Sequence, residues 1–432
     1  GGSAINYDEP IIFTFNGKKI MGYQGDTIAS ALLANNKRVV GRSYKYGRPR
    51  GIFAAGPEEP NGILQLGSTE ASQVPNVRAT QQEIYEGLEC RTTNGWPSVD
   101  YDVMGLFGWL AEKFLPAGFY YKTFMFPAFL WDFYECLIRR AAGLGRASEE
   151  PDPDTYDHLN HHADVVVVGA GPAGMQAASV LARSGARVML IDANPWLGGS
   201  LLVDPQEING TDCQAWVSDI QDQLFDSGVT VLKRTTVIGY HDHNYLVAHE
   251  KRTDHGSESC PEYSRQRLHL IRAEQVILAT GAQDRPLVYA RNDLPGCMQA
   301  HAVKTYIRRY GVVPGEQLVL MTTNDAAWET AFAWHDTGRE VVAIVDTRTA
   351  PGSAMVGGAM QRGIPVFTSS AVIEAKGSKS VRRAKIAHIS DGEVDGTVQN
   401  LACDTIASSG GWSPVVHLTC HTGARPVWRE DI

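Results

Sequence analysis

Hydrophobic and polar positions near the N-terminus follow a β pattern. Ile11–Phe15 and Lys19–Tyr23 alternate with a period of two on either side of Asn16–Gly17, an arrangement typical of a hairpin. A helix is expected to start at Asp26, a favourable N-cap residue, and to carry one apolar face. This pattern predicts a small α+β domain over residues 1–95.

Aromatic residues dominate the next segment, from 96 to 160. It becomes polar and proline-rich at Glu149–Asp154, which indicates a linker. We expect a helical connector that either packs on its own chain or forms a docking surface for another subunit, because aromatic residues are enriched in interfaces. The most apolar stretch, Phe114–Ile138, contains charged residues that a membrane-spanning helix tolerates poorly, so no membrane segment is expected.

From Ala163 onward, a strand, a glycine turn, a helix and a second strand recur, which predicts a parallel sheet covered by helices. Val165–Val168 forms the first strand, and its β-branched residues indicate burial on both faces. It leads directly into the turn Gly169–Gly174, and a helix follows. The next strand, Arg187–Ile191, ends in Asp192. A glycine turn between a buried strand and a helix is an arrangement that binds phosphates.

Each position of this turn has a physical role in binding a dinucleotide. Gly169 permits a tight turn, Gly171 leaves room for a pyrophosphate beside the backbone, and Gly174 lets helix and strand pack closely. The helix N-terminus offers N–H groups and the positive end of its dipole to the phosphates. Asp192 can accept hydrogen bonds from ribose hydroxyls and would repel a 2′-phosphate, which favours NAD or FAD over NADP.

Later glycine turns extend the predicted site. Gly198–Ser200 follows the acid, and a strand at Gln275–Ala279 leads into Thr280–Gly281. Ser409–Pro414 has the form of an equivalent turn that closes an inserted domain. Each turn alone could be a simple strand end, but together they favour one cofactor edge. The predicted cofactor-binding residues are Gly169, Gly171, Pro172, Ala173, Gly174, Asp192, Ala193, Gly199, Ser200, Thr236, Val237, Thr280 and Gly281.

The predicted fold class is α/β, with a two-domain, flavoprotein-like Rossmann-type fold preceded by a ferredoxin-like α+β domain. The predicted division is a ferredoxin-like domain at 1–95, a linker at 96–160, a dinucleotide-binding domain at 161–295 plus 401–432, and an inserted second nucleotide-binding-like domain at 296–400. In the inserted domain, Thr322, Asn324 and Ala327 stand where fingerprint glycines would. Their side chains would block a pyrophosphate, so we expect no second dinucleotide there.

Composition argues against several function classes. The formal net charge of −9 disfavours nucleic-acid binding, which rests on clustered basic residues. The cysteines show no C-x-x-C motif, which indicates reduced thiols in a cytoplasmic protein without a disulfide framework or metal site. Cys213 has no evident partner thiol, which argues against a disulfide reductase. His161–His162 is interpreted as the solvated start of a strand, and no catalytic residue is assigned.

Several longer segments, together with the glycine turn, carry a family resemblance: Gly25–Asn35, Arg48–Ile52, Glu58–Asn61, Pro116–Met125 and Gly410–Leu418. With them the chain resembles the α subunit of heterotetrameric sarcosine oxidase over essentially all 432 residues. The resemblance implies an oxidoreductase of bacterial one-carbon metabolism that acts on CH–NH donors and converts sarcosine to glycine with O₂ and tetrahydrofolate.

In that family, the α subunit holds NAD, the β subunit carries FAD and a covalent FMN, and γ and δ complete the heterotetramer. The resemblance therefore implies that this chain holds NAD at its predicted site and is active only with partner subunits. The amine substrate would be oxidised on the flavins of the partner.

Two departures from related proteins lead to further expectations. Related [2Fe–2S] domains carry cysteines after the Arg-Pro-Arg-Gly loop, whereas this chain has Ile52–Pro57 there and no cysteine before Cys90. A cluster usually needs four thiolates, so we expect no iron–sulfur cluster. The chain also stops at Ile432, without the final nucleotide-binding segment and folate-binding domain of the family, so we expect a truncated sequence.

Two alternatives remain open at this point. The chain could be the FAD-binding subunit of a related amine, opine or cyanide-forming dehydrogenase, because FAD and NAD share the ADP moiety that the fingerprint recognises. It could also be a non-catalytic scaffold whose dinucleotide is structural, because its sequence has no recognisable acid–base motif.

Overall fold

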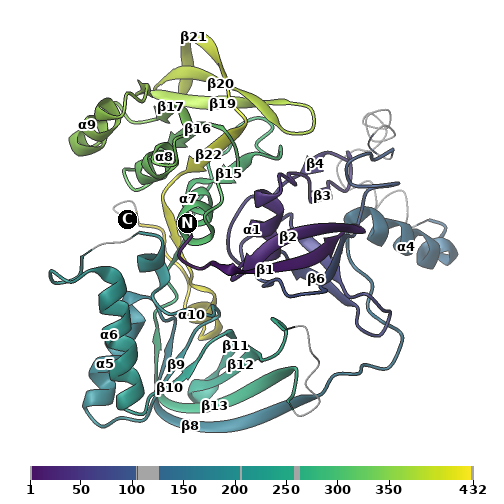
Figure 1. Cartoon of the computed structure of the whole chain (residues 1–432), viewed down its shortest axis with the longest axis vertical. Helices are drawn as coiled ribbons and strands as arrows, with labels where there is room; N and C mark the ends of the chain where they lie inside the picture. The colour runs from purple at the N-terminus through teal and green to yellow at the C-terminus, as the bar shows by residue number, and fades with distance from the viewer. Residues whose placement is uncertain (1, 104, 106–125, 205–206, 257–262, 430–432) are drawn as a thin grey trace. The chain divides into compact units, whose positions relative to one another are not determined.

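The computed structural model describes residues 2–103, 105, 126–204, 207–256 and 263–429 (Figure 1). The chain divides into two compact units, the first comprising Gly1–Pro153 and Asp284–Gly411 and the second Asp154–Gln283 and Trp412–Ile432. Pro116–Met125, part of the family resemblance, lies outside the described residues, as do several aromatic residues of the predicted linker.

The N-terminal part of the first unit contains the strands β1 (Asn6–Phe15), β2 (Lys18–Gln24), β3 (Gly41–Arg42), β4 (Pro49–Arg50), β5 (Ile63–Leu66), β6 (Val74–Arg78) and β7 (Glu89–Thr92). One sheet has the strand order β2-β1-β7-β5-β6, and β1 and β2 form the expected antiparallel hairpin around Asn16–Gly17. Helix α1 (Ile28–Ala34) buries its apolar face in the core. Its N-cap is Thr27 rather than the expected Asp26, because the Thr27 side chain accepts the Ser30 N–H.

The described part of the aromatic linker contains η2 (Ala128–Leu130) and α4 (Trp131–Ala142). Phe126 and Phe129 are each 82% exposed, and Phe133 is 61% exposed. Packing on the chain itself, one of the two alternatives, therefore does not hold for these three side chains. Within the described ranges, no helix is both long and apolar enough to cross a membrane.

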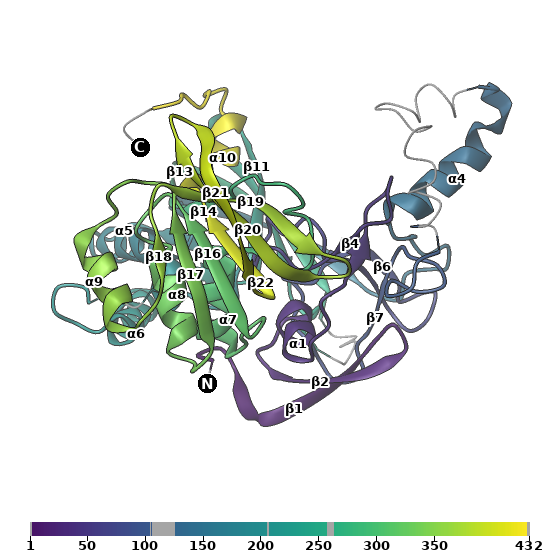
Figure 2. The same ribbon diagram turned by 90° about the horizontal axis from the view of Figure 1, so that it is seen from above.

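The rest of the first unit is the inserted domain. Its parallel sheet has the order β15-β22-β16-β17-β18, from β15 (Cys297–Gln299), β16 (Gln317–Thr322), β17 (Glu340–Asp346), β18 (Val366–Phe367) and β22 (Thr405–Ser409). Its helices are α7 (Ala300–Tyr310), α8 (Trp328–His335) and α9 (Ser353–Gln361). An antiparallel sheet of β19 (Ser370–Gly377), β20 (Val381–Ser390) and β21 (Glu393–Ala402) lies beside it (Figure 2). Trp328 and Trp334 of α8 are completely buried in this core.

The second unit is built on the sheet β10-β9-β8-β13-β12-β11. Its strands are β8 (Tyr156–Val168), β9 (Val188–Ile191), β10 (Thr230–Leu232), β11 (Thr235–His241), β12 (Tyr245–Lys251) and β13 (Gln266–Leu278). The chain leaves this unit within β14 (Ala282–Asp284) and returns at β23 (Trp412–Pro414). Its helical segments are α5 (Pro172–Arg183), η3 (Gly199–Leu202), α6 (Cys213–Asp226), η4 (Asp242–Asn244) and α10 (His417–His421).

Strands β8, β9, β10 and β13 run parallel, whereas β11, β12 and β13 are antiparallel neighbours. Helices α5 and α6 lie side by side on one face of the sheet (Figure 1). There Val167 and Leu190 pack against Met175 and Ala178 of α5. Packing against these helices fixes the positions of β8 and β9. The predicted site lies at the carboxyl ends of these two strands.

Candidate dinucleotide site

The predicted glycine turn connects β8 to α5 at the carboxyl end of the parallel strands. Gly169 has φ +103°, and a Cβ there would lie 2.2 Å from the Ala279 carbonyl oxygen. A Cβ at Gly174 would lie 1.8 Å from the carbonyl oxygen of Gly169. Contacts this short exclude any side chain, so backbone packing alone requires glycine at both positions.

Gly171 faces open space instead of protein. Outside its chain neighbours, a Cβ built there meets one described atom within 4 Å, the Gly199 Cα at 3.9 Å. Gly171 is the N-cap of α5, Pro172 is the first helical residue, and no side chain caps this helix through its N-cap residue. The first N–H groups of a helix lack intrahelical partners, so the turn presents bare backbone and the positive end of the dipole. This arrangement suits phosphate groups.

The Asp192 carboxylate is turned toward the same turn. Its Oδ2 accepts the Ala170 N–H at 2.6 Å, and its Oδ1 accepts the backbone N–H and side-chain amide of Asn194 at 2.7 and 3.0 Å. The residue is partly exposed. A carboxylate offers about four lone-pair positions, so these three hydrogen bonds leave capacity for a ribose hydroxyl.

The loop after β9 brings further predicted residues to the turn. The Gly198 N–H donates to the Ala170 carbonyl at 2.8 Å. The adjacent Gly199 and Ser200 are exposed at the start of η3, and Ala193 is exposed beside the acid. All three therefore lie on the accessible edge of the fingerprint.

The remaining predicted residues come from two other segments. The Thr235 N–H donates to the Asp192 carbonyl at 2.8 Å, which places Thr236 and Val237 of β11 directly after that contact; Thr236 is exposed and Val237 is buried. Thr280 donates its hydroxyl to the Val415 carbonyl at 2.7 Å. The structure thus gathers strands that are distant in sequence around one edge.

Two residues of this neighbourhood were missed from the sequence. Asn194 holds the Asp192 carboxylate, and an asparagine two residues after an aspartate is a recognisable turn signal that could have found it. Val415 donates its N–H to the Gly281 carbonyl at 3.0 Å in addition to accepting from Thr280. No local signal marks Val415, because the contact depends on the return of the chain at β23.

His161 is not simply a solvated residue, as the sequence suggested. Its Nε2 lies 2.8 Å from Nδ1 of His269, and Nε2 of the buried His269 lies 3.0 Å from the Glu250 carboxylate. Burial, followed by the neighbouring His269 and Arg267, lowers the pKa of His161. The hydrogen bond from His269 lowers the pKa of Glu250. These residues fasten β8, β13 and β12 together, and none of them belongs to the glycine turn.

A bare glycine turn, an open helix N-terminus and a strand-tip carboxylate together define a Rossmann-type dinucleotide-binding unit. Residues 163–425 match the family model of pyridine nucleotide-disulphide oxidoreductases, and the chain belongs to that family. The lack of an evident partner thiol for Cys213 argued against a disulfide reductase, but it does not exclude the chain from this family, because membership rests on the match of residues 163–425 to the family model. Cys213 itself is buried at the start of α6.

Curated relatives place the chain more narrowly. It is 45% identical over 429 residues to sarcosine oxidase subunit alpha of Rhizobium meliloti (strain 1021), covering 99% of this chain and 42% of the relative. It is 38% identical to the subunit of the same name from Corynebacterium sp. (strain P-1), covering 99% of this chain and 40% of that protein. The predicted resemblance is confirmed, and the chain spans about two fifths of the length of these relatives.

A solved structure also shares the fold. The crystal structure of L-proline dehydrogenase from P. horikoshii aligns with a TM-score of 0.60 and 19% identity, covering 98% of this chain and 64% of that one. Residues 8–95 match the family model of the 2Fe-2S iron-sulfur cluster binding domain. The predicted fold class, a ferredoxin-like domain followed by a Rossmann-type α/β fold, is confirmed.

This last match corrects the cofactor prediction. We expected no iron–sulfur cluster, but the model of a 2Fe-2S cluster binding domain matches residues 8–95 and points to a cluster. The expectation rested on counting cysteines, whereas the match draws on the pattern of the whole domain.

The residues present do not supply the usual cluster ligands. Cys90 is the only cysteine of residues 8–95, and a cluster usually takes four thiolates. Cys90 is buried, its thiol donates to the Thr14 carbonyl, and burial raises its pKa to about 12. In the loop after β4, the buried Glu59 carboxylate accepts N–H groups from Phe53, Ala54, Asn61 and Gly62.

Proposed function

We propose that the chain holds NAD in its second unit and forms the dinucleotide-binding part of a sarcosine oxidase α subunit. One observation carries the proposal: Gly171 opens onto free space at the start of α5 while the Asp192 carboxylate is turned to the same turn. The relatives named sarcosine oxidase subunit alpha support the choice of enzyme.

Each predicted residue has a role in this proposal. The pyrophosphate lies against the backbone of Gly171, Pro172, Ala173 and Gly174, and Gly199 and Ser200 border it from the loop after β9. Asp192 accepts a hydrogen bond from a ribose hydroxyl, beside Ala193. Thr236, Val237, Thr280 and Gly281 border the same edge. Bound NAD would supply a nicotinamide that can accept or release a hydride.

Partners complete the proposed enzyme. The relatives are named as alpha subunits, which implies other subunits. We assign oxidation of sarcosine to the FAD and FMN of a β subunit, with γ and δ completing a cytoplasmic assembly. This chain contributes cofactor binding and no catalytic residue.

The test is an absorbance spectrum of the purified full chain, followed by mass analysis of the nucleotide released on denaturation. Colourless protein that releases NAD would support the proposal. A flavin absorbance band at about 450 nm, together with a released nucleotide of the mass of FAD, would instead identify the FAD-binding subunit of a related amine, opine or cyanide-forming dehydrogenase. Absence of any dinucleotide would refute both.

A second measurement separates an enzyme subunit from a scaffold. Sarcosine-dependent turnover is measured for the chain assembled with its partner subunits, with Gly171→Val as the variant. If the NAD is only structural, the folded Gly171→Val variant would assemble with its partners and oxidise sarcosine at the normal rate, although it has lost the dinucleotide. A drop in turnover with intact assembly would support a functional role for the bound NAD.

A further inference from the structure

The inserted domain repeats the arrangement of the dinucleotide site: a strand, a turn, a helix and a second strand that ends in an aspartate. We call this arrangement the frame. β16 leads through a turn into α8, and β17 ends in Asp346, the position that Asp192 holds after β9. We infer that side chains of the inserted domain close this second frame, so that the chain holds a single dinucleotide, in its second unit. The inference rests on the proposed function for the identity of the occupied site.

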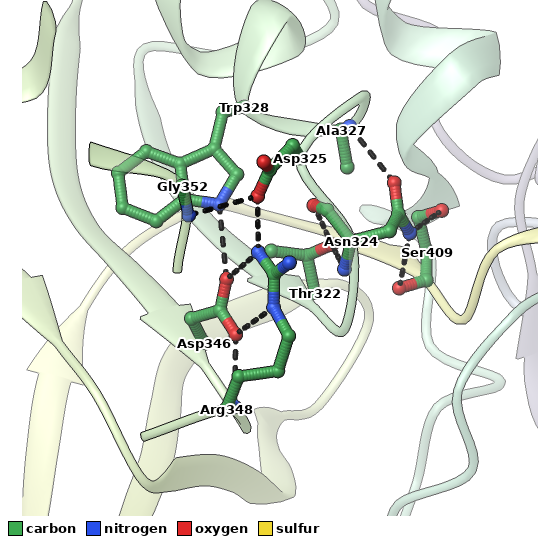
Figure 3. Close-up of polar contacts among 9 residues, drawn as sticks. All are labelled: Thr322, Asn324, Asp325, Ala327, Trp328, Asp346, Arg348, Gly352 and Ser409. Atoms are coloured by element: carbon green, nitrogen blue, oxygen red, sulfur yellow. Dashed lines mark hydrogen bonds and ion pairs between the residues drawn. The ribbon is translucent and has the colours of Figure 1, made fainter. Parts of the chain in front are cut away.

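The first closing residue is Asn324, where the second fingerprint glycine would stand (Figure 3). Its Oδ1 accepts the Ala327 N–H at 3.1 Å, at the start of α8. Its backbone is fixed by Thr322, whose hydroxyl accepts the Asn324 N–H at 3.0 Å and donates to the Asn324 carbonyl at 2.9 Å. A phosphate would have to displace this side chain and break its hydrogen bond to the N–H of Ala327, the N-cap residue of α8.

A buried network holds Asn324 in place. Its Nδ2 donates to the Ser409 hydroxyl oxygen at 3.0 Å, and that hydroxyl donates to the Asp284 carboxylate at 2.6 Å. Ser409 and Asp284 are both buried. Rotating the amide away from the turn would therefore leave Ser409 without one of its partners in a region where polar groups need them.

The strand-tip acid is also fully engaged. Asp346 is completely buried, and its Oδ2 accepts the Trp328 Nε1–H at 3.0 Å and an Arg348 Nη2–H at 2.8 Å. Its Oδ1 accepts the Arg348 N–H at 2.9 Å and Nε–H at 3.0 Å. These four hydrogen bonds use the lone-pair positions of a carboxylate, so no capacity remains for a ribose hydroxyl.

A further carboxylate occupies the cationic part of this edge (Figure 3). Asp325 accepts a hydrogen bond from Arg348 Nη2 at 2.6 Å and the Gly352 N–H at 3.3 Å, at the start of α9. The guanidinium and helix terminus that could attract a phosphate already have an anion of the chain itself. A bound pyrophosphate would lie beside that negative charge and be repelled by it.

The test counts dinucleotides bound per chain. The full chain, Gly171→Val and Asn324→Asp are each dialysed to equilibrium against NAD, and co-purified nucleotide is included in the count. We expect one per chain for the unaltered protein, none for Gly171→Val and one for Asn324→Asp. The Asn324→Asp change keeps an oxygen that can accept the Ala327 N–H but adds a negative charge that would abolish phosphate binding at the start of α8. Gly357→Val controls for the added valine, because nothing lies within 4 Å of a Cβ at Gly357.

The outcomes separate this inference from the proposed function. Two dinucleotides on the unaltered chain, with one lost in each variant, would overturn closure and leave the proposed site intact. One dinucleotide that survives Gly171→Val and disappears in Asn324→Asp would overturn both. Circular dichroism of each variant establishes that a lost site is not a lost fold, and the count on the unaltered chain tests the inference even where a variant fails to fold.

Discussion

The chain builds the frame of strand, turn, helix, strand and acid twice, and completes it in opposite ways. In the second unit, Gly171 leaves the helix start bare and Asp192 keeps capacity for another hydrogen bond. In the inserted domain, the Asn324 side chain accepts the Ala327 N–H at the start of α8, and the four lone-pair positions of Asp346 are all used. The comparison teaches that a frame is retained for its packing, while a few side chains at the strand ends decide whether it can bind.

The two frames also differ in what their polar groups do for stability. Groups of the closed frame are paired within the protein, so changing them should cost free energy of unfolding. In the open frame, Gly171 faces open space and Asp192 is partly exposed and keeps hydrogen-bonding capacity, so changing these residues should mainly cost binding.

The largest expected effect concerns pH and the end of the closed network at Asp284. Burial raises the pKa of Asp284 to about 6 from 3.8, with Ser409 and His301 opposing this as hydrogen-bond donors. The folded chain therefore binds this proton more tightly than the unfolded chain. The contribution of Asp284 to the free energy of unfolding is most favourable below about pH 4 and falls by about 3 kcal/mol in total as pH rises through about 6. Above that pH it no longer changes.

The measurement is the free energy of unfolding in urea from pH 4 to 7 for the full chain and for Asp284→Asn. Other carboxylates affect both proteins alike, so the difference between the two curves isolates Asp284. We expect the native chain to lose stability relative to the variant as pH rises. Parallel curves would show that the closed network does not end on a buried charge.

The next effect is loss of the saturated acid. Asp346→Ala leaves the buried Trp328 Nε1–H and Arg348 without their acceptor, and we expect the free energy of unfolding to fall by about 2–3 kcal/mol. This loss of unfolding free energy is smaller than for a fully buried ion pair, because the Arg348 side chain is 32% exposed and keeps its ion pair with Asp325. The matched change Asp192→Ala should cost less than about 1 kcal/mol. Equal losses in urea unfolding would mean that the two acids are not used differently.

The next prediction compares opposite substitutions at the third glycine position of the two frames, Gly174→Ala and Ala327→Gly. Gly174→Ala forces a Cβ against the Gly169 carbonyl, so we expect a loss of about 1–3 kcal/mol together with loss of the bound dinucleotide. Ala327→Gly, at the same position of the closed frame, should cost no more than about 1 kcal/mol. Thermal unfolding and nucleotide analysis of both variants measure the pair. A Gly174→Ala protein that is stable and retains nucleotide would contradict the packing role of this glycine.

How much the sequence could predict depended on whether the cause was local. The glycine turn, α5 and the strand before Asp192 follow from neighbouring residues, and they were predicted. The N-terminal halves of β8 and β13 were missed, because Tyr156–His162 is polar and has no apolar pattern. What makes it a strand is its ladder to β13, with pairs such as Arg267 and Asp157, whose hydrogen bonds are each 2.8 Å long.

The same limit applied to the two sites. Obstruction by Thr322, Asn324 and Ala327 could be expected from their place in the turn. The ion pair of Arg348 with Asp325 could not, because it depends on how closely the turn after β17 approaches the turn before α8. The iron–sulfur expectation failed for a related reason, since it weighed cysteine count against a family pattern spread over residues 8–95.

The smallest effect, on affinity alone, is expected for Asp192→Asn. Asparagine keeps one acceptor oxygen near Ala170 but loses the charge that strengthens a hydrogen bond from ribose, a difference of about 1–1.5 kcal/mol or about tenfold in the Kd for NAD. Asp164→Asn is the control, because Asp164 also lies in the second unit but pairs with Arg187 on the surface. Isothermal titration of NAD into both variants measures the change, with urea unfolding expected to be nearly unaltered for Asp192→Asn. If both variants bind as tightly as the unaltered chain, the ribose is held by another group, and the contrast between an open and a saturated acid would not explain binding.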